Sequence, residues 1–206
     1  MEDKKQIKSV EMFNKTAERY YDTYNGRHAK KVTALVYQSL EEIMQESGAL
    51  LDVGCGTGSL IRQLENRYKR WKFFGIDLSE KMLGICERYK SDRQCFFKAS
   101  SEKIPFDEKT FKVVTCTDSF HHYVNPQKAM EEMYRVLEKD GHLVMSEIWL
   151  PFIARKVTNL FLKVFNTGDV KIYGKSELTK LMREAGFRTV HFKVKSLMIY
   201  ECIATK

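Results

Sequence analysis

Leu50-Leu51-Asp52-Val53-Gly54-Cys55-Gly56-Thr57-Gly58 joins a short apolar run to an acid and then to three glycines at alternate positions. Residues 49–53 have the composition of a buried parallel strand, and a helix is expected to begin near Ser59. The glycines allow a tight turn and a close approach of a ligand to the backbone. We therefore predict a strand that opens into a ligand-binding turn, with free amide N–H groups facing a polar or anionic ligand.

The spacing of these glycines narrows the choice of ligand. A nicotinamide or flavin site typically has G-x-G-x-x-G, in which the third glycine packs the helix against the strand, whereas this chain has G-x-G-x-G. Asp52, just before the turn, would repel a pyrophosphate but suits a ligand that carries an ammonium group. The stretch therefore favours a nucleoside bearing an amino acid over a dinucleotide.

Further motifs follow the glycine turn in the chain. The first, Phe73-Phe74-Gly75-Ile76-Asp77-Leu78-Ser79, is an apolar strand that ends in an acid, one helix and one strand after the turn, as a βαβ unit requires. The others are the loop Ser100-Ser101-Glu102-Lys103-Ile104-Pro105-Phe106, the strand 111–117 with Asp118-Ser119-Phe120-His121-His122 after it, and the helix end, turn and strand of 135–145.

These motifs resemble, in order and over nearly the whole chain, the class I S-adenosylmethionine-dependent methyltransferases. The resemblance is to methyltransferase type 11, the small-molecule group that includes the ubiquinone/menaquinone C-methyltransferase-like enzymes. It implies S-adenosyl-L-methionine as cofactor, S-adenosyl-L-homocysteine as product and a small-molecule methyl acceptor. It also implies an α/β fold with a Rossmann-like, doubly wound, seven-stranded sheet whose last strand is antiparallel, helices on both faces and an N-terminal helical lid.

By this resemblance, Asp77 would bind the ribose hydroxyls, while Leu78 and Met82 would flank the adenine, although packing of their helix on the sheet is a competing role. The family usually has Asp in the adenine-binding loop where this chain has Ser100, whose hydroxyl accepts more weakly. The predicted cofactor-binding residues are Asp52, Gly54, Cys55, Gly56, Gly58, Asp77, Leu78, Met82, Ser100, Ser101, Glu102, Thr117 and His122.

Methyl transfer from a sulfonium is an in-line displacement, so the protein mainly has to align the reactants and exclude water. A general base is useful only if the acceptor must lose a proton. The candidate catalytic residues are His121, His122 and Tyr20, with Asp118, Tyr21 and Tyr24 as further candidates. In the family the second His of the doublet usually buttresses the cofactor loop. The remaining histidines, His28, His142 and His191, are expected to be structural or exposed.

The strand at 111–117 is followed neither by Asn/Asp-Pro-Pro-Tyr, common in enzymes that methylate amino or amide nitrogens of nucleic acids and proteins, nor by a Pro-Cys nucleophile. This favours a small-molecule O-, C- or N-methyltransferase. Two alternatives stay open. One is an RNA-modifying methyltransferase, motivated by the net charge of +8. The other is a non-catalytic module that binds S-adenosylmethionine, for which Ser100 is the only sign.

The composition fits one domain of 206 residues with 43% hydrophobic content. No segment approaches ~18 uninterrupted apolar residues and the N-terminus lacks a signal-peptide pattern, so we expect a cytoplasmic, soluble protein without a membrane span.

The five cysteines are scattered and never in Cys-x-x-Cys spacing, which indicates a reducing compartment and no metal site. The positive charge raises nucleic acid or an acidic membrane as partners, but the basic residues are interspersed with acids, as on solvated helices.

Four regions are expected within this domain: a helical lid at 1–47 made of two helices that meet at Asn25-Gly26, a cofactor-binding core at 48–149, a helical insertion at 150–170, and a helix with a hairpin at 171–206. Within the insertion, residues 152–165 are expected to form the second wall of the substrate pocket. Residues 166–169 are expected to be a loop. The protein is expected to be a monomer or a homodimer. Strands are expected at 49–53, 71–76, 94–98, 111–117, 141–148, 187–195 and 197–205, and helices at 59–68, 79–89, 126–137, 152–165 and 176–185.

Overall fold

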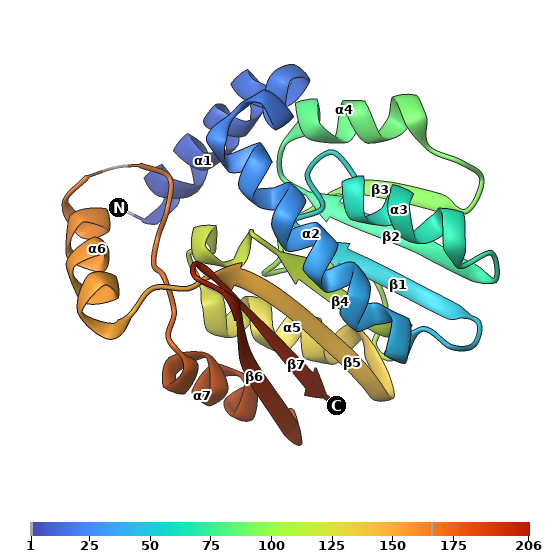
Figure 1. Ribbon diagram of the computed structural model, residues 1–206. Coiled ribbons are helices and arrows are strands. Elements are labelled where there is room, and N and C mark those ends of the chain that lie inside the picture. The colour runs from blue at the N-terminus through green and yellow to red at the C-terminus, as the bar shows by residue number, and fades with distance from the viewer. Residues whose placement is uncertain (1, 166) are drawn as a thin grey trace.

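The computed structural model describes residues 2–165 and 167–206 (Figure 1). Strands and helices alternate over residues 48–98 and again over residues 111–164, as the hydrophobic pattern predicts. In chain order the elements are α1 (Glu2–Thr16), the 3-10 helix η1 (Ala17–Asp22), α2 (Tyr24–Ile43), β1 (Gly48–Val53), α3 (Ser59–Arg67), β2 (Trp71–Asp77), α4 (Glu80–Tyr89), β3 (Gln94–Lys98), β4 (Phe111–Thr117), the 3-10 helix η2 (Phe120–His122), α5 (Pro126–Val136), β5 (Leu137–Ile148), α6 (Phe152–Val164), α7 (Lys175–Ala185), β6 (Thr189–Ser196) and β7 (Ile199–Thr205).

The strands form a seven-stranded sheet in the order β3-β2-β1-β4-β5-β7-β6. Strand β7 lies between β5 and β6 and is antiparallel to both, whereas the other six strands share one direction. This confirms the predicted doubly wound sheet with an antiparallel last strand. The chain leaves β1 toward β2 on one side and later returns to β4 on the other. A switch of this kind creates a crevice at the carboxyl ends of β1 and β4, where ligands bind in open α/β sheets.

Helices cover both faces of the sheet (Figure 1). On one face, α2 and α3 pack through Val36, Leu40 and Ile61 against Leu50 and Phe73. On the other face, α5 and α7 pack against the side chains of β1, β4, β5 and β7 that point the opposite way. Because β1 is buried on both faces, its sequence is a continuous apolar run instead of an alternating one.

Two boundaries differ from the sequence-based expectation by more than two residues. The N-terminal helices meet at η1 and not at Asn25-Gly26. The reason is that Thr23 is the N-cap of α2: its hydroxyl accepts the N–H of Gly26, so the helix begins at Tyr24 and Asn25-Gly26 lies in its first turn. Strand β5 begins at Leu137, before the expected turn, and its register with β4 shifts around Asp140, whose φ is +62°. Of the loop expected at 166–169, Asn166 lies outside the described residues.

Among the described residues, no helix combines the length and the apolar character that a crossing of the bilayer requires.

Candidate active site

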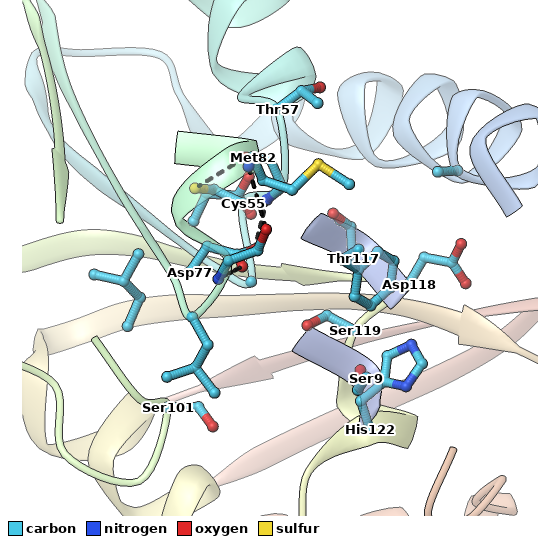
Figure 2. Close-up of a pocket in the computed structure, with 18 of the residues that line it drawn as sticks. Ser9, Cys55, Thr57, Asp77, Met82, Ser101, Thr117, Asp118, Ser119 and His122 are labelled. Carbon is cyan, nitrogen blue, oxygen red and sulfur yellow. Dashed lines mark hydrogen bonds between the residues drawn. The ribbon is translucent and has the colours of Figure 1, made fainter. Parts of the chain in front are cut away.

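A pocket opens at the carboxyl ends of β1, β2 and β4, beneath α1 and η1. Figure 2 shows two sides of this pocket, with Asp77 and Met82 on one and Asp118, Ser119 and His122 on the other. Most of the predicted site residues line it. They are Tyr20, Asp52, Gly54, Cys55, Gly56, Asp77, Leu78, Met82, Ser101, Thr117 and His122.

The glycine turn after β1 is held by its own amides. The N–H groups of Gly54 and Cys55 both donate to the carbonyl of Ile76, and the N–H of Gly58 donates to that of Cys55. The N–H of Gly56 donates to the Asp77 carboxylate at 2.8 Å. The prediction that the turn presents free amides is therefore wrong for these four residues. What the turn offers is clearance, because a Cβ built on Gly56 meets nothing within 4 Å.

Asp77 closes β2 at the floor of the pocket. Its second carboxylate oxygen accepts the N–H of Ser79 at 2.8 Å, and the Ser79 hydroxyl caps α4 by accepting the N–H of Met82. Burial raises the pKa of Asp77, while these backbone hydrogen bonds counteract the rise. The acid is therefore fixed in orientation by the turn on one side and the helix on the other.

Asp52 lies deeper, with 1% of its surface exposed, and accepts a hydrogen bond from the Thr115 hydroxyl at 2.7 Å. Burial raises its pKa to about 7, the Thr115 bond acts in the opposite direction, and the nearby charge of Asp77 adds to the rise. A cationic group placed near Asp52 would favour its ionised form. The pairing of Asp52 with an ammonium group of the ligand therefore stays a prediction.

The roof of the pocket is aromatic. Phe13, Tyr20 and Tyr21 come from α1 and η1, and Phe13 packs edge-to-face on His122 with ring centroids 5.2 Å apart. The Tyr21 hydroxyl lies 2.9 Å from that of Thr57, which links the roof to the glycine turn. Burial and the charge of Asp118 raise the pKa of Tyr20, so its hydroxyl stays protonated and can donate but not act as a base at neutral pH.

The two candidate histidines of η2 differ in charge. His121 Nδ1 lies 2.6 Å from Glu147 Oε2, and although burial alone lowers the pKa of His121, the charge of Glu147 raises it to about 9. Burial and the charge of His121 lower the pKa of His122 well below its ordinary value. His121 is thus a cation that cannot accept a proton, and it lies outside the pocket lining, whereas His122 lines the pocket in its neutral form.

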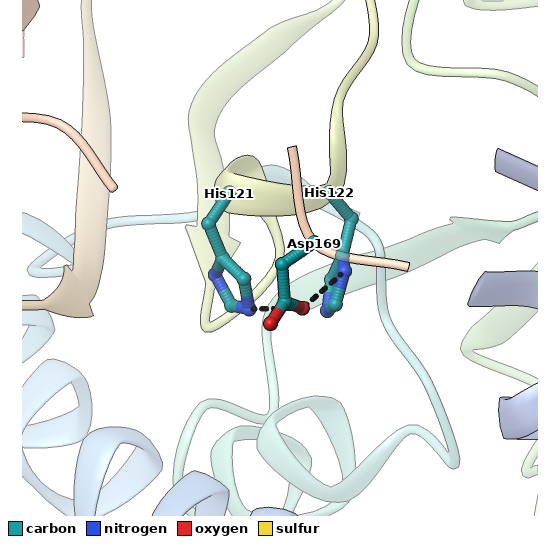
Figure 3. A group of neighbouring side chains, drawn as sticks. All are labelled: His121, His122 and Asp169. Atoms are coloured by element: carbon teal, nitrogen blue, oxygen red, sulfur yellow. Dashed lines mark ion pairs between the residues drawn. The ribbon is translucent and has the colours of Figure 1, made fainter. Parts of the chain in front are cut away.

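Asp169 lies between the two histidine rings (Figure 3). Its carboxylate is 3.2 Å from His122 Nδ1 and 3.9 Å from His121 Nε2. The three ligand-type atoms lie within 4.8 Å of one another, a spacing that one cation could bridge. The positive charge of His121 and the polar contact of Asp169 with the neutral His122 ring already account for the arrangement. Backbone bonds from Val170 and Lys171 to the carbonyl of His121 hold this loop against η2.

A second acid–histidine pair reaches the pocket from α2. His28 Nε2 lies 3.6 Å from Asp118 Oδ1, and within the described part of the chain neither atom has a hydrogen-bond partner. Burial raises the pKa of Asp118 to about 7 and lowers that of His28. Asp118 has a φ of +51°, a conformation that non-glycine residues seldom adopt. His28 was expected to be merely structural or exposed, yet only 13% of its side chain is accessible and it faces the pocket acid.

Comparison with known proteins places this geometry in a family. Residues 51–145 match a family model described as a methyltransferase domain. The chain is 23% identical over 228 residues to a demethylmenaquinone methyltransferase of Thermotoga maritima, which covers 95% of this chain and 96% of that protein. It is 27% identical to a ubiquinone/menaquinone biosynthesis C-methyltransferase of Rhizobium rhizogenes over 88% of this chain and 82% of the relative.

The chain is a class I S-adenosylmethionine-dependent methyltransferase. Its methyl donor is S-adenosylmethionine. The fold of this methyltransferase also matches a solved structure from Thermotoga maritima, described as a possible histamine N-methyltransferase, with a TM-score of 0.68, 21% identity and coverage of 96% of this chain and 98% of that chain.

Five predicted site residues of the methyltransferase lie outside the pocket lining: Tyr24, Gly58, Ser100, Glu102 and His121. The Ser100 hydroxyl accepts the N–H of Glu102, and the Glu102 carboxylate accepts that of Asn125, so both side chains order the loop instead of facing the pocket. Ser101 lines the pocket in their place. The prediction that residues 152–165 form the second wall is also wrong, because no described residue of α6 lines the pocket and its other walls come from α1, η1 and α2.

Two residues that matter for the site were missed. Glu147 is buried, accepts the backbone N–H groups of Ser119 and Phe120, and pairs with His121. An acid inside the apolar strand 143–148 is the signal that could have revealed it, since buried carboxylates require partners. Asp169 has no comparable signal, because it lies in an irregular loop that reaches η2 only through the tertiary fold.

Proposed function

We propose that this methyltransferase methylates a ring carbon of a small hydroxylated aromatic acceptor of the quinol class. The observation that carries the proposal is the character of the pocket beneath α1 and η1. It has the aromatic rings of Phe13, Tyr20 and Tyr21 and the neutral imidazole of His122, and none of the described residues in its lining is Lys or Arg. Such a lining suits a flat, uncharged ring. The names of the two curated relatives point to the same class of acceptor.

The cofactor would occupy the side of the pocket next to β1 and β2. Asp77 would accept hydrogen bonds from the ribose, Leu78 and Met82 would flank the adenine, and Asp52 would pair with the ammonium group. The open space at Gly56 supports this fit, since a side chain there would fill the volume that the ligand needs. When bound, S-adenosylmethionine supplies an electrophilic methyl group on a sulfonium that leaves as a neutral thioether.

The chain's own part in the transfer is to orient the acceptor and move its proton. Asp118 lines the pocket and its pKa of about 7 lets it accept a proton from the acceptor hydroxyl at neutral pH. His28 would hold this carboxylate in place. A carbon–carbon bond to the ring forms as the carbon–sulfur bond breaks, the ring carbon then loses its proton to solvent, and Asp118 returns the hydroxyl proton. One proton is released per turnover.

The test is transfer of labelled methyl from S-adenosylmethionine to a panel of a short-chain naphthoquinol, a catechol, histamine and transfer RNA. We expect label on a ring carbon of the quinol, identified by mass and by NMR of the product. Label on RNA alone, or on none of the acceptors except histamine, would refute the proposal. The missing basic side chains in the pocket argue against RNA, whose phosphates need Lys and Arg.

The role of Asp118 has its own test. Asp118→Asn should lower kcat by about 100-fold or more, with the affinity for S-adenosylhomocysteine unchanged. In the wild type, kcat should rise with pH through about 7 as the carboxyl ionises, and the variant should lack this ionisation. Asp22→Asn, at a carboxylate that is 70% exposed and lies outside the pocket lining, is the matched control and should leave kcat and its pH profile unchanged. An unaltered pH profile in Asp118→Asn would remove Asp118 from the mechanism.

An amine acceptor is a second candidate, favoured by one observation. Asp118 presents a buried carboxylate oxygen without a hydrogen-bond partner among the described residues, and a protonated amine could pair with it. The panel above separates the two candidates, because an amine would carry the label on nitrogen.

A further inference from the structure

Helix α6 is attached to the rest of the protein along a narrow face. Only Leu162 of this helix is buried. The Asn159 side chain exchanges two hydrogen bonds of 2.9 Å with the backbone of Ile172, and Lys5 of α1 donates to the carbonyl of Leu162. In Figure 1 the helix lies at the periphery of the molecule, away from the sheet. The opposite face of α6 is therefore exposed to solvent.

That opposite face is apolar. Ile153, Val157, Leu160 and Val164 are spaced by four, three and four residues, so they form one stripe along the helix. Their exposed fractions are 76%, 50%, 64% and 71%. The exposed rings of Phe152, Phe161 and Phe165 widen the stripe. Monomeric proteins seldom leave so many large apolar side chains side by side in water, and such a surface marks a site of interaction.

The turn between β6 and β7 continues this apolar surface. Leu197 is 91% exposed and Met198 is 42% exposed. The carbonyl of Met198 accepts the N–H of Trp149 at 2.8 Å, three residues before α6 begins, so the turn lies beside the start of the helix. The surface thus draws on two elements far apart in the sequence.

The charges around the stripe are positive. Between Glu147 and Asp169 the sequence has three basic residues and no acid. Arg155 points back toward Glu177, at 3.9 Å, while Lys156 and Lys163 lie seven residues apart on one side of the stripe and are exposed. An apolar helix face edged by lysines, with no acid, is the pattern of a helix that lies in the interface of a membrane with anionic lipids.

A second copy of the chain fits this surface less well. A twofold interface is self-complementary, so α6 would face α6 and the lysines of each copy would lie near those of the other without an acidic partner on either helix. At 13 residues the helix is also too short to cross a bilayer, which takes about 20 residues. We propose that α6 and the β6–β7 turn form a docking surface that rests in the headgroup region of an anionic membrane.

Docking there would bring the methyltransferase to the lipid-soluble members of its proposed acceptor class. The two proposals fail separately, because vesicle binding is measured without any acceptor and a short-chain quinol is methylated in solution without any membrane.

The experiment is co-sedimentation of the purified full chain with vesicles of phosphatidylcholine alone or with one third phosphatidylglycerol, at low and high salt. We expect binding to the anionic vesicles that weakens with salt. Ile153→Glu and Leu160→Glu should each lower the partition coefficient by roughly tenfold or more. Tyr89→Glu, a 65% exposed aromatic on α4, is the matched control and should bind as the wild type does. Binding of S-adenosylhomocysteine by each variant shows that it is folded.

Three results would overturn the proposal. The first is a folded wild type that sediments with neither vesicle, and the second is vesicle binding that survives both glutamate substitutions. The third is a dimer in light scattering that Leu160→Glu dissociates, together with no binding to vesicles, which would assign the surface to a second copy of the chain.

Discussion

Replacing Asp52 by Asn should make the unliganded protein more stable at alkaline pH and less able to bind its cofactor. The carboxyl is buried and its pKa rises from 3.8 in the unfolded chain to about 7 in the fold. The native state therefore holds a proton that the unfolded state has lost between these two values, and stability falls as pH rises through this window. Well above pH 7 the full difference corresponds to about 4 kcal/mol at 1.36 kcal/mol per pKa unit.

Relaxation around the ionised carboxylate recovers part of this cost, so we expect Asp52→Asn to gain about 2 kcal/mol or more at high pH and close to zero below pH 4. Asparagine keeps an oxygen that can accept the Thr115 hydrogen bond, which limits other losses. The assay is urea unfolding of both proteins across this pH range. Asp22→Asn is the control, since the Asp22 side chain is 70% exposed and its removal should change stability by less than about 0.5 kcal/mol.

In the same samples, Asp52→Asn should weaken S-adenosylmethionine binding by about tenfold, because the ammonium group loses a buried charged partner. A gain in stability together with a loss of S-adenosylmethionine affinity would indicate that the buried carboxylate of Asp52 destabilises the unliganded fold and contributes to ligand binding. The reasoning would be refuted if Asp52→Asn were less stable than the wild type at alkaline pH, or if the difference between the two did not change with pH.

Three further substitutions test the turn, the roof and the histidine pair. Gly54→Ala should destabilise the fold by about 2–4 kcal/mol in urea unfolding. Gly54 has a φ of +77°, and a Cβ at this position would overlap the Ser119 hydroxyl oxygen. A loss of stability below about 1 kcal/mol would contradict this. Tyr21→Phe should weaken S-adenosylhomocysteine binding in calorimetry by about 3- to 10-fold through loss of the bond to Thr57, and an unchanged affinity would separate the roof from the cofactor. Burial lowers the pKa of His121, but Glu147 raises it to about 9 overall, so the ion pair stabilises the fold fully below the unfolded pKa of 6.5 and this contribution is lost as pH rises through 9. His121→Gln should therefore flatten the fall in unfolding free energy between pH 6.5 and 9. A fall parallel to that of the wild type would count against the ion pair.

The sheet and the cofactor half of the site follow from local pattern. Apolar runs that end in Asp52 and Asp77 mark two neighbouring parallel strands, and Ser79, a residue type common at helix N-termini, caps the next helix. The physical reason is that strand burial, glycine turns and helix caps depend on residues close in the chain. The hydrogen bonds of the turn amides could not be predicted in this way, because the N–H groups of Gly54 and Cys55 donate to the carbonyl of Ile76, which belongs to another strand.

The acceptor half depends on contacts between distant segments. His28 meets Asp118 only because α2 crosses over β4, and no spacing in the sequence signals that meeting. Likewise, α6 has the apolar pattern of a helix that packs on a core, so the sequence alone predicted a pocket wall. The structure instead leaves that face exposed, since the roof made by α1 and η1 already closes the pocket.

The most direct test of the account is calorimetric titration of S-adenosylmethionine and S-adenosylhomocysteine into the wild type and Asp77→Ala, with NAD as the control ligand. The account predicts one site per chain for both sulfur ligands in the wild type, no measurable binding in Asp77→Ala and none of NAD to either protein. A folded wild type that binds neither sulfur ligand, or an Asp77→Ala variant that binds them as tightly as the wild type, would contradict the placement of the cofactor at the end of β2.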